Sequence, residues 1–267
     1  MFAADLARRR LFALPIISMN IVQSLWIGPL LSPLQQMSVS SFLANGHPFH
    51  LYSYDPIDGV PEGTTLCDAA TILPRESIFC YQNGFGKGSH SAFSNLFRYK
   101  LLLDRGGWWV DTDLVCLKPF DFAAPYVFAT ETDSDWTIQR ATCAIRCPQG
   151  APILQHCYDV AHAADKQTLE WGQIGPQLFS SAVTRFGLDD FSMPTETFNP
   201  INFFEFEALR APAFDISRLH ASYAVHFWNQ MWKNSETDPL AVPPSDSLYG
   251  MLLAKYAPSA RRESVPS

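Results

Sequence analysis

Residues 94–120 read SNLFRYKLLLDRGGWWVDTDLVCLKPF, and this stretch carries the clearest secondary-structure signals in the chain. Its first half belongs to an amphipathic pattern that predicts a helix over 91–104, which the glycine pair at 106–107 ends. The next residues, 108–117, are apolar almost throughout, apart from the Asp-Thr-Asp sequence at 111–113. A continuous apolar run is typical of a buried central strand, and two carboxylates within it indicate that its end opens into a site.

The remainder of the chain alternates strand-like and helix-like segments, which indicates the α/β class. Strands are expected at 21–28, 48–54, 67–73, 108–117, 126–130, 142–146 and 223–228, and helices at 33–44, 91–104, 152–164, 176–186 and 245–256. The pattern contains no internal repeat or obvious linker, and 267 residues suit one globular domain with a substantial core. We therefore predict a single domain over residues 1–267.

The composition favours a globular protein over one that binds nucleic acid. Hydrophobic residues make up 47% of the chain, and the formal net charge is −7. A nucleic-acid-binding domain normally has a basic face, which this acidic balance argues against. The negative net charge does not exclude small anionic ligands, because one metal ion and a few local cations can bind them. The six cysteines have irregular spacings, and we expect them to be free and mostly buried thiols.

The N-terminal segment allows two interpretations. Three arginines at 8–10 precede an apolar stretch over 11–31, which could be a signal anchor. Pro15 and several polar residues interrupt that stretch, however, and residues 21–27 also fit a first buried strand. We therefore expect a cytoplasmic protein whose basic N-terminus makes at most peripheral contact with the inner face of the membrane.

Asp111 and Asp113 give the strongest chemical signal. In a regular strand they would project to the same face, where two carboxylates repel each other and are costly to bury. A divalent cation removes that conflict, and a site with few protein carboxylates is typical where phosphates and waters complete the coordination. The pattern therefore predicts Mg²⁺ or Mn²⁺ bridging to a diphosphate. An isolated Asp-X-Asp also occurs in ordinary turns and at solvated strand ends. The flanking residues are therefore needed to distinguish a metal site from these alternatives.

The flanking sequence resembles the DXD glycosyltransferases of family 32, which include bacterial polysaccharide transferases and eukaryotic mannosyl- and α-1,4-galactosyltransferases. The similarity runs without a gap over 94–120, through Ser-Asn-X-X-Arg-Tyr, a Gly-Gly turn, Asp-Thr-Asp and Lys-Pro. Weaker similarities follow in the family's order at Gln23-X-X-Trp26-X-Gly28, at Gly175-Pro176, and at Val225-His226-X-Trp228. Together these segments extend the resemblance over most of the chain.

The resemblance implies a GT-A fold, in which helices flank a mixed central sheet. A Rossmann-like half that binds the nucleotide-sugar is expected at about 20–120, an acceptor-side half at about 121–258, and a mobile tail at 259–267. The donor implied is a UDP- or GDP-linked sugar, and the implied cofactor is Mn²⁺ or Mg²⁺.

The resemblance also implies the metal ligands. Asp113 is expected to coordinate the metal directly, and Asp111 to contact the ribose or to reach the metal through water. His226 is the expected C-terminal ligand to the metal or the diphosphate, and its imidazole suits Mn²⁺.

Further residues are expected around the donor. Arg98 is expected to face the sugar or its phosphate with a fixed cationic fork, and Trp26 to stack on the base. Thr112 and Gly175 are also expected to contribute to the donor site. Asn95 stands where the family usually has an aspartate that hydrogen-bonds sugar hydroxyls, and this departure leaves the identity of the donor sugar open.

The implied activity is metal-dependent transfer of a sugar, with retention of configuration, from a nucleotide-diphosphate sugar to a hydroxyl of a glycan or glycolipid. We favour front-face attack with the leaving phosphate as base. Glu131, Asp133 and Asp135 follow an expected strand end, and we favour a solvated acidic loop for them over a role as acceptor-side or catalytic carboxylates. Two alternatives stay open: a metal-dependent nucleotide-sugar hydrolase or pyrophosphatase, and a non-catalytic carbohydrate-binding module.

Overall fold

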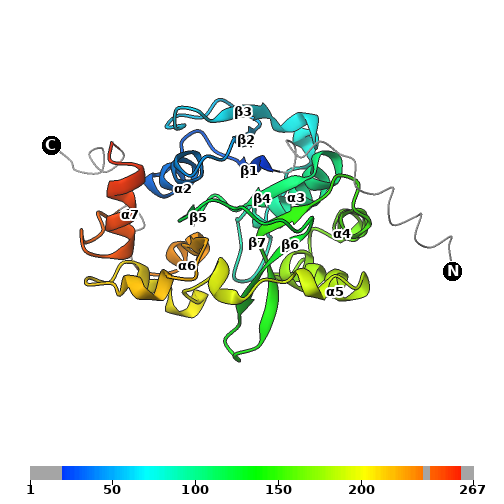
Figure 1. Ribbon diagram of the computed structural model, residues 1–267. Helices are drawn as coiled ribbons and strands as arrows, with labels where there is room; N and C mark the ends of the chain where they lie inside the picture. Colours follow the sequence, from blue (N-terminus) through cyan, green and yellow to red (C-terminus); the bar gives the residue numbers. More distant parts are fainter. Residues whose placement is uncertain (1–19, 237–240, 260–267) are drawn as a thin grey trace.

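The computed structural model describes residues 20–236 and 241–259, which form a mixed α/β fold (Figure 1). Its main sheet has six strands in the order β3-β2-β1-β4-β7-β6. The strands are β1 (Val22–Trp26), β2 (Phe49–Ser53), β3 (Thr65–Asp68), β4 (Gly107–Val110), β6 (Val127–Thr132) and β7 (Ile138–Cys147). The pairs among β1 to β4 are parallel, whereas β7 is antiparallel to both β4 and β6. The prediction of a mixed central sheet with a Rossmann-like first half is therefore confirmed.

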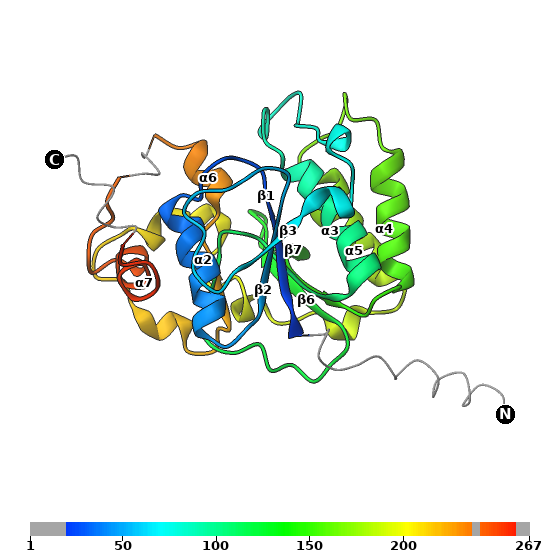
Figure 2. The same cartoon turned by 90° about the horizontal axis from the view of Figure 1, so that it is seen from above.

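Helices cover both faces of this sheet. They are α2 (Pro33–Ala44), α3 (Ser91–Arg105), α4 (Pro152–Ala163), α5 (Leu178–Arg185), α6 (Asn229–Lys233) and α7 (Leu248–Tyr256). Figure 2 shows α3, α4 and α5 on one side of the sheet and α2, α6 and α7 on the other. Because both faces are covered, β4 is buried at each of its residues, as its apolar sequence GWWV requires.

The junction between α3 and β4 fixes the geometry of the first half. The helix ends at Gly106, whose φ of 66° and ψ of −165° lie in a region that is essentially restricted to glycine. The amide of Gly106 donates to the carbonyl of Leu102 at 2.8 Å, and its own carbonyl accepts from the buried Gln23 side chain at 2.8 Å. Gln23 lies on β1, so one side chain ties the turn to the neighbouring strand.

The expected single strand over 108–117 is wrong in one important respect. β4 ends at Val110, residues 111–113 form a turn, and the chain continues as β5 (Leu114–Cys116). β5 belongs to a separate two-stranded sheet, where it pairs antiparallel with β8 (Ala224–His226). The apolar run concealed this break, because the residues on both sides of the turn are buried.

Other boundaries differ more modestly. The strand expected at 67–73 ends at Asp68, because the Asp68 carboxylate accepts from the amide of Ala70 and begins a short 3-10 helix. The helix expected from residue 176 begins at Leu178, after an irregular turn over Gln173–Gln177, and the closing helix begins at Leu248. Expected and observed bounds agree closely for α2, α3 and α4.

Several expectations concern the chain as a whole. All six cysteines are free, and four of them are buried, as expected. Among the described residues, no helix is long and apolar enough to span a membrane. The basic segment at 8–10 lies outside the described residues, as does all of the expected tail except Ser259. The division into a donor half and an acceptor half stays a prediction.

Replacing Gly106 by alanine should destabilise the fold strongly. A Cβ atom there would lie 2.5 Å from the backbone nitrogen of Gln149, in addition to the unfavourable backbone conformation. We expect Gly106→Ala to lower the free energy of unfolding by roughly 3 kcal/mol or more. Gly46→Ala is the control, because Gly46 also has a positive φ but has open space around it, so about 1–2 kcal/mol is expected. Urea unfolding measures both values, and equal losses would contradict the steric argument.

Candidate active site

A cavity of about 650 Å³ opens where β1 and β4 end. Ligands of open α/β sheets bind outside the carboxyl ends of the strands, and this cavity has that position. Residues that follow these strands line it, together with the side of α3 that faces them and the segment after β8. Its lining includes Trp26, Asn95, Arg98, Asp111, Thr112, Asp113 and His226. A cavity of this size can hold a ligand of nucleotide-sugar dimensions.

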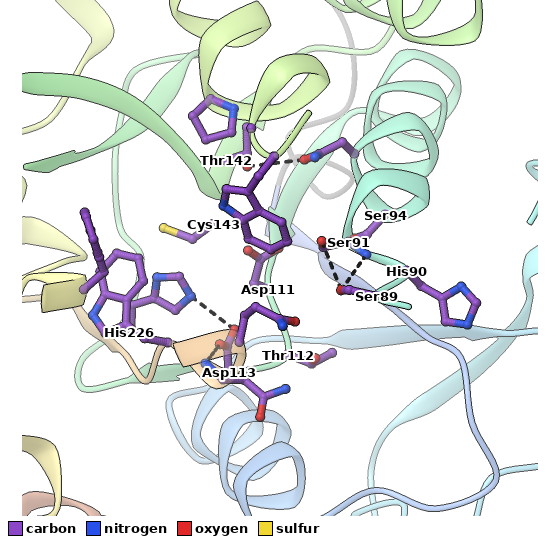
Figure 3. Close-up of a pocket in the computed structure, with 18 of the residues that line it drawn as sticks. Ser89, His90, Ser91, Ser94, Asp111, Thr112, Asp113, Thr142, Cys143 and His226 are labelled. Carbon is purple, nitrogen blue, oxygen red and sulfur yellow. Dashed lines mark hydrogen bonds and ion pairs between the residues drawn. The ribbon is translucent and has the colours of Figure 1, made fainter. Parts of the chain in front are cut away.

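Asp113 is held by the segment that follows β8. In the β5–β8 pair Leu114 stands opposite His226, and the amide of Phe227 donates to the backbone carbonyl of Asp113 at 2.9 Å. This register places His226 Nε2 3.2 Å from Asp113 Oδ1, an interaction visible in Figure 3. Trp228 then adopts a left-handed conformation, and the next amide, that of Asn229, donates to Asp113 Oδ2 at 2.7 Å. Both carboxylate oxygens of Asp113 therefore have fixed positions.

Asp111 is held from the opposite side. Its Oδ1 accepts from Arg98 at 2.8 Å and from the indole Nε1 of Trp109 at 2.8 Å. Arg98 is only 3% exposed, donates to the carbonyl of Thr142 at 2.9 Å, and places its guanidinium 4.8 Å from the centre of the Trp109 ring. A buried arginine needs such partners, and the ion pair with Asp111 supplies the countercharge.

Asp111, Asp113 and His226 form a group that could hold a metal ion. Each offers a ligand atom, and these atoms lie within 4.8 Å of one another. Two carboxylate oxygens and one imidazole nitrogen form a donor set that suits Mn²⁺ well and leaves positions for phosphate oxygens and water. The residues present therefore fit the metal that the sequence predicted.

The electrostatics of this group show what a metal would replace. Burial by itself would lower the pKa of His226, but the adjacent Asp113 carboxylate raises it well above the usual value. Burial likewise opposes ionisation of Asp113, whose pKa the His226 imidazolium nevertheless lowers. Without a cation, the pair is thus a buried imidazolium and carboxylate. A divalent ion bound here would take over the role of the proton shared between them.

Comparison with known proteins agrees with this site. Residues 73–134 match the glycosyltransferase sugar-binding region containing the DXD motif, and residues 149–263 match the alpha 1,4-glycosyltransferase conserved region. The chain is a glycosyltransferase. The first region contains Asp111 and Asp113, and the second contains His226, so the resemblance seen in the sequence is confirmed.

Two glycosyltransferases are among the solved structures with some similarity to this chain. The PaToxG glycosyltransferase shares 16% identity with a TM-score of 0.49, over 64% of this chain and 70% of that one. The apo form of the glycosyltransferase GlyE from Streptococcus pneumoniae shares 12% identity with a TM-score of 0.43, over 89% of this chain and 63% of that one. No curated protein matches the chain.

In this glycosyltransferase, Asn95 and Gly175 are neighbours. The buried Asn95 lies on α3, where its Oδ1 accepts from the hydroxyl of Thr142 at 3.4 Å. A Cβ atom at Gly175 would lie 2.7 Å from Asn95 Nδ2. Gly175 is absent from the cavity lining, unlike the other predicted donor-site residues. Gly175 packs against the Asn95 side chain, and because it has no Cβ atom it leaves room for the Asn95 amide group.

Trp26 and Thr112 both line the cavity, as the sequence predicted. Trp26 ends β1 and is half-buried, and its Nε1 has no hydrogen-bond partner among the described residues. That nitrogen is itself buried, so the part of Trp26 that lines the cavity is what could contact a ligand.

Glu131 has a more prominent position than the sequence predicted. The solvated acidic loop considered for it is wrong, since Glu131 lies on β6, lines the cavity, and accepts from the Gln139 amide across the strand pair at 2.9 Å. Burial raises its pKa to about 7. The β-branched and aromatic residues of VFATET could have placed Glu131 in the strand, but not at the cavity. Trp109 and Asn229 were missed as partners of the two aspartates.

Metal binding to this glycosyltransferase should release a proton. His226 is protonated beside Asp113 and must become neutral to coordinate, so Mn²⁺ binding near pH 7 should release about one proton. The affinity should fall by about tenfold for each unit that the pH decreases below the pKa of His226. Calorimetry in two buffers with different ionisation enthalpies counts the protons. His226→Asn should abolish the release and weaken binding, whereas the exposed control His220→Gln should change neither.

Proposed function

We propose that this glycosyltransferase transfers a sugar, with retention of configuration, from a UDP- or GDP-linked donor to a hydroxyl of a glycan or glycolipid, and that it requires Mn²⁺ or Mg²⁺. The observation that carries the proposal is the convergence of Asp111, Asp113 and His226 within 4.8 Å at the cavity. One buried acid, one partly exposed acid and a buried histidine suit a cation that in turn binds a diphosphate.

The charges of the site favour a diphosphate. Asp111 and Asp113 contribute two negative charges and Arg98 contributes one positive charge. With His226 neutral, a divalent ion turns this net negative group into a net positive one. That surplus would bind the donor diphosphate, and when bound the metal would stabilise the charge that develops on the leaving group.

The remaining donor-site residues have distinct proposed tasks. Trp26 would stack on the base, while Thr112 would contact the phosphates or the ribose from the turn. Asn95 would hydrogen-bond hydroxyls of the transferred sugar, in a position fixed by Thr142 and Gly175. Arg98 would act mainly by orienting Asp111, because the ion pair and the Thr142 carbonyl already engage its guanidinium.

Retention and location belong to the same proposal. An α-linked product formed from an α-linked nucleotide-sugar corresponds to retention, which the family match at 149–263 supports. We favour attack on the same face, with the leaving phosphate accepting the proton of the acceptor hydroxyl. Polysaccharide or glycolipid synthesis in a bacterial cytoplasm, with at most peripheral membrane contact, is the proposed setting.

Asp113→Asn should abolish metal-dependent donor binding. A panel of UDP- and GDP-sugars, titrated with and without Mn²⁺, should show one nucleotide class that binds when the metal is present and is released by EDTA. Losing the charge and one ligand oxygen should weaken that binding by about 100-fold or more. The exposed Asp121→Asn is the matched control and should bind normally. Binding that is equally tight without metal would refute the metal assignment.

Asn95→Asp should change the choice of donor. The substitution keeps the size and an acceptor oxygen but removes the amide donors, so the ranking of kcat/KM among donor sugars should change by about tenfold or more. The melting temperature should change less than it does in Gly175→Ala, where the new Cβ collides with the Asn95 amide. Identical donor rankings in the wild type and Asn95→Asp would exclude Asn95 from sugar recognition.

A further inference from the structure

The hairpin formed by β6 and β7 carries an exposed aromatic side chain at its tip. Figure 1 shows the hairpin projecting beyond the rest of the sheet. Trp136 lies in its turn, is 72% exposed, and has a φ of 62°, which is unusual for a bulky residue. Asp133 holds this turn, because its carboxylate accepts from the amides of Asp135 and Thr137 at 3.0 and 2.8 Å. The turn thus keeps a large apolar ring in water.

Aromatic rings connect Trp136 to Asp111, Asp113 and His226, which we call the metal-ligand group because they could hold an ion. The ring of His226 lies 4.0 Å from that of Trp228, which in turn lies 6.1 Å from Phe203. Phe203 and Phe204 are 5.3 Å apart, and Phe204 packs edge-on against Trp136 at 5.5 Å. We call these five residues, His226, Trp228, Phe203, Phe204 and Trp136, the aromatic wall. It begins in the cavity and ends on the surface.

Polar groups of the hairpin accompany the aromatic wall. Glu131, Asp133 and Gln139 line the same cavity as Phe203 and Trp228. A path with aromatic rings and with carboxylate and amide groups suits a pyranose, whose C–H faces are apolar and whose hydroxyls donate and accept hydrogen bonds. The negative charge of Asp133 and Asp135 disfavours an anionic membrane surface as the partner of this hairpin.

We propose that the aromatic wall is the acceptor-binding surface of this glycosyltransferase, and that Trp136 and Phe204 form a platform on which a sugar ring of a carbohydrate acceptor stacks. The inference rests on the proposed function, since a transferase must place an acceptor hydroxyl beside the donor sugar. The wall leads the acceptor from the surface to the metal-ligand group. Glu131 and Asp133 then receive acceptor hydroxyls along the way.

Fluorine NMR of protein labelled with 5-fluorotryptophan tests the platform without requiring catalysis. The chain has seven tryptophans, and the loss of one resonance in Trp136→Phe identifies that of Trp136. The probes are the methyl glycosides of glucose, galactose, mannose and N-acetylglucosamine, together with lactose and maltose. At least one should shift the Trp136 resonance saturably, and Trp136→Ala should weaken its binding by about three- to tenfold. Trp136→Phe should retain part of the affinity.

Two controls separate this inference from the proposed function. Leu66→Ala removes an apolar side chain that is 52% exposed on β3, at the opposite edge of the sheet, and should leave saccharide binding unchanged. Trp136→Ala should leave metal-dependent donor binding unchanged. Loss of donor binding in Asp113→Asn therefore tests the proposed function, whereas loss of saccharide binding in Trp136→Ala tests the acceptor surface. The proposal is overturned if no saccharide shifts the Trp136 resonance. It is equally overturned if vesicles of neutral phospholipid, or self-association that Trp136→Ala abolishes, shift it instead.

Discussion

The pairing of β5 with β8 is the constraint on which the site depends. It sets Leu114 opposite His226, and by doing so it brings a histidine from the end of the fold against a carboxylate from its middle. The same segment supplies the Asn229 amide to the other oxygen of Asp113. A shift of one residue in this register would turn His226 to the other face of the strand, and the metal-ligand group would be lost.

The break between β4 and β5 explains why Asp111 and Asp113, which are separated by one residue, have different neighbours. In an unbroken strand they would have shared one environment. The turn instead directs Asp111 to Arg98 and Trp109 on the α3 side, and Asp113 to His226 and Asn229 on the β8 side. Each carboxylate is therefore oriented by its own set of donors, and such orientation of ligands by surrounding hydrogen bonds is what makes a metal site rigid.

The sequence predicted the parts of this structure that depend on local signals. Helix α2 follows from Pro33 at its start and Asn45-Gly46 at its end, and the residues of α3 show a clear apolar face. The turn at 111–113 could not be predicted, because an apolar run looks the same whether it continues in one sheet or moves to another. The aspartate pair was suggested by its own spacing, and the other candidate residues came from the resemblance. The cavity position of Glu131 and the contact of Gly175 with Asn95 depend instead on tertiary packing.

The two regions matched by family models are structurally interdependent. The region at 73–134 contains both aspartates and Arg98, but His226 and the Asn229 amide come from the region at 149–263. Without β8, Asp113 would lose its hydrogen-bond partners, and β5 would lose the strand with which it pairs. The first region therefore supplies both aspartates but does not by itself hold Asp113 in place. The hairpin that carries Trp136 lies mainly between the two regions and joins them, so the surface that we assign to the acceptor belongs to the segment that links the sources of the candidate metal ligands.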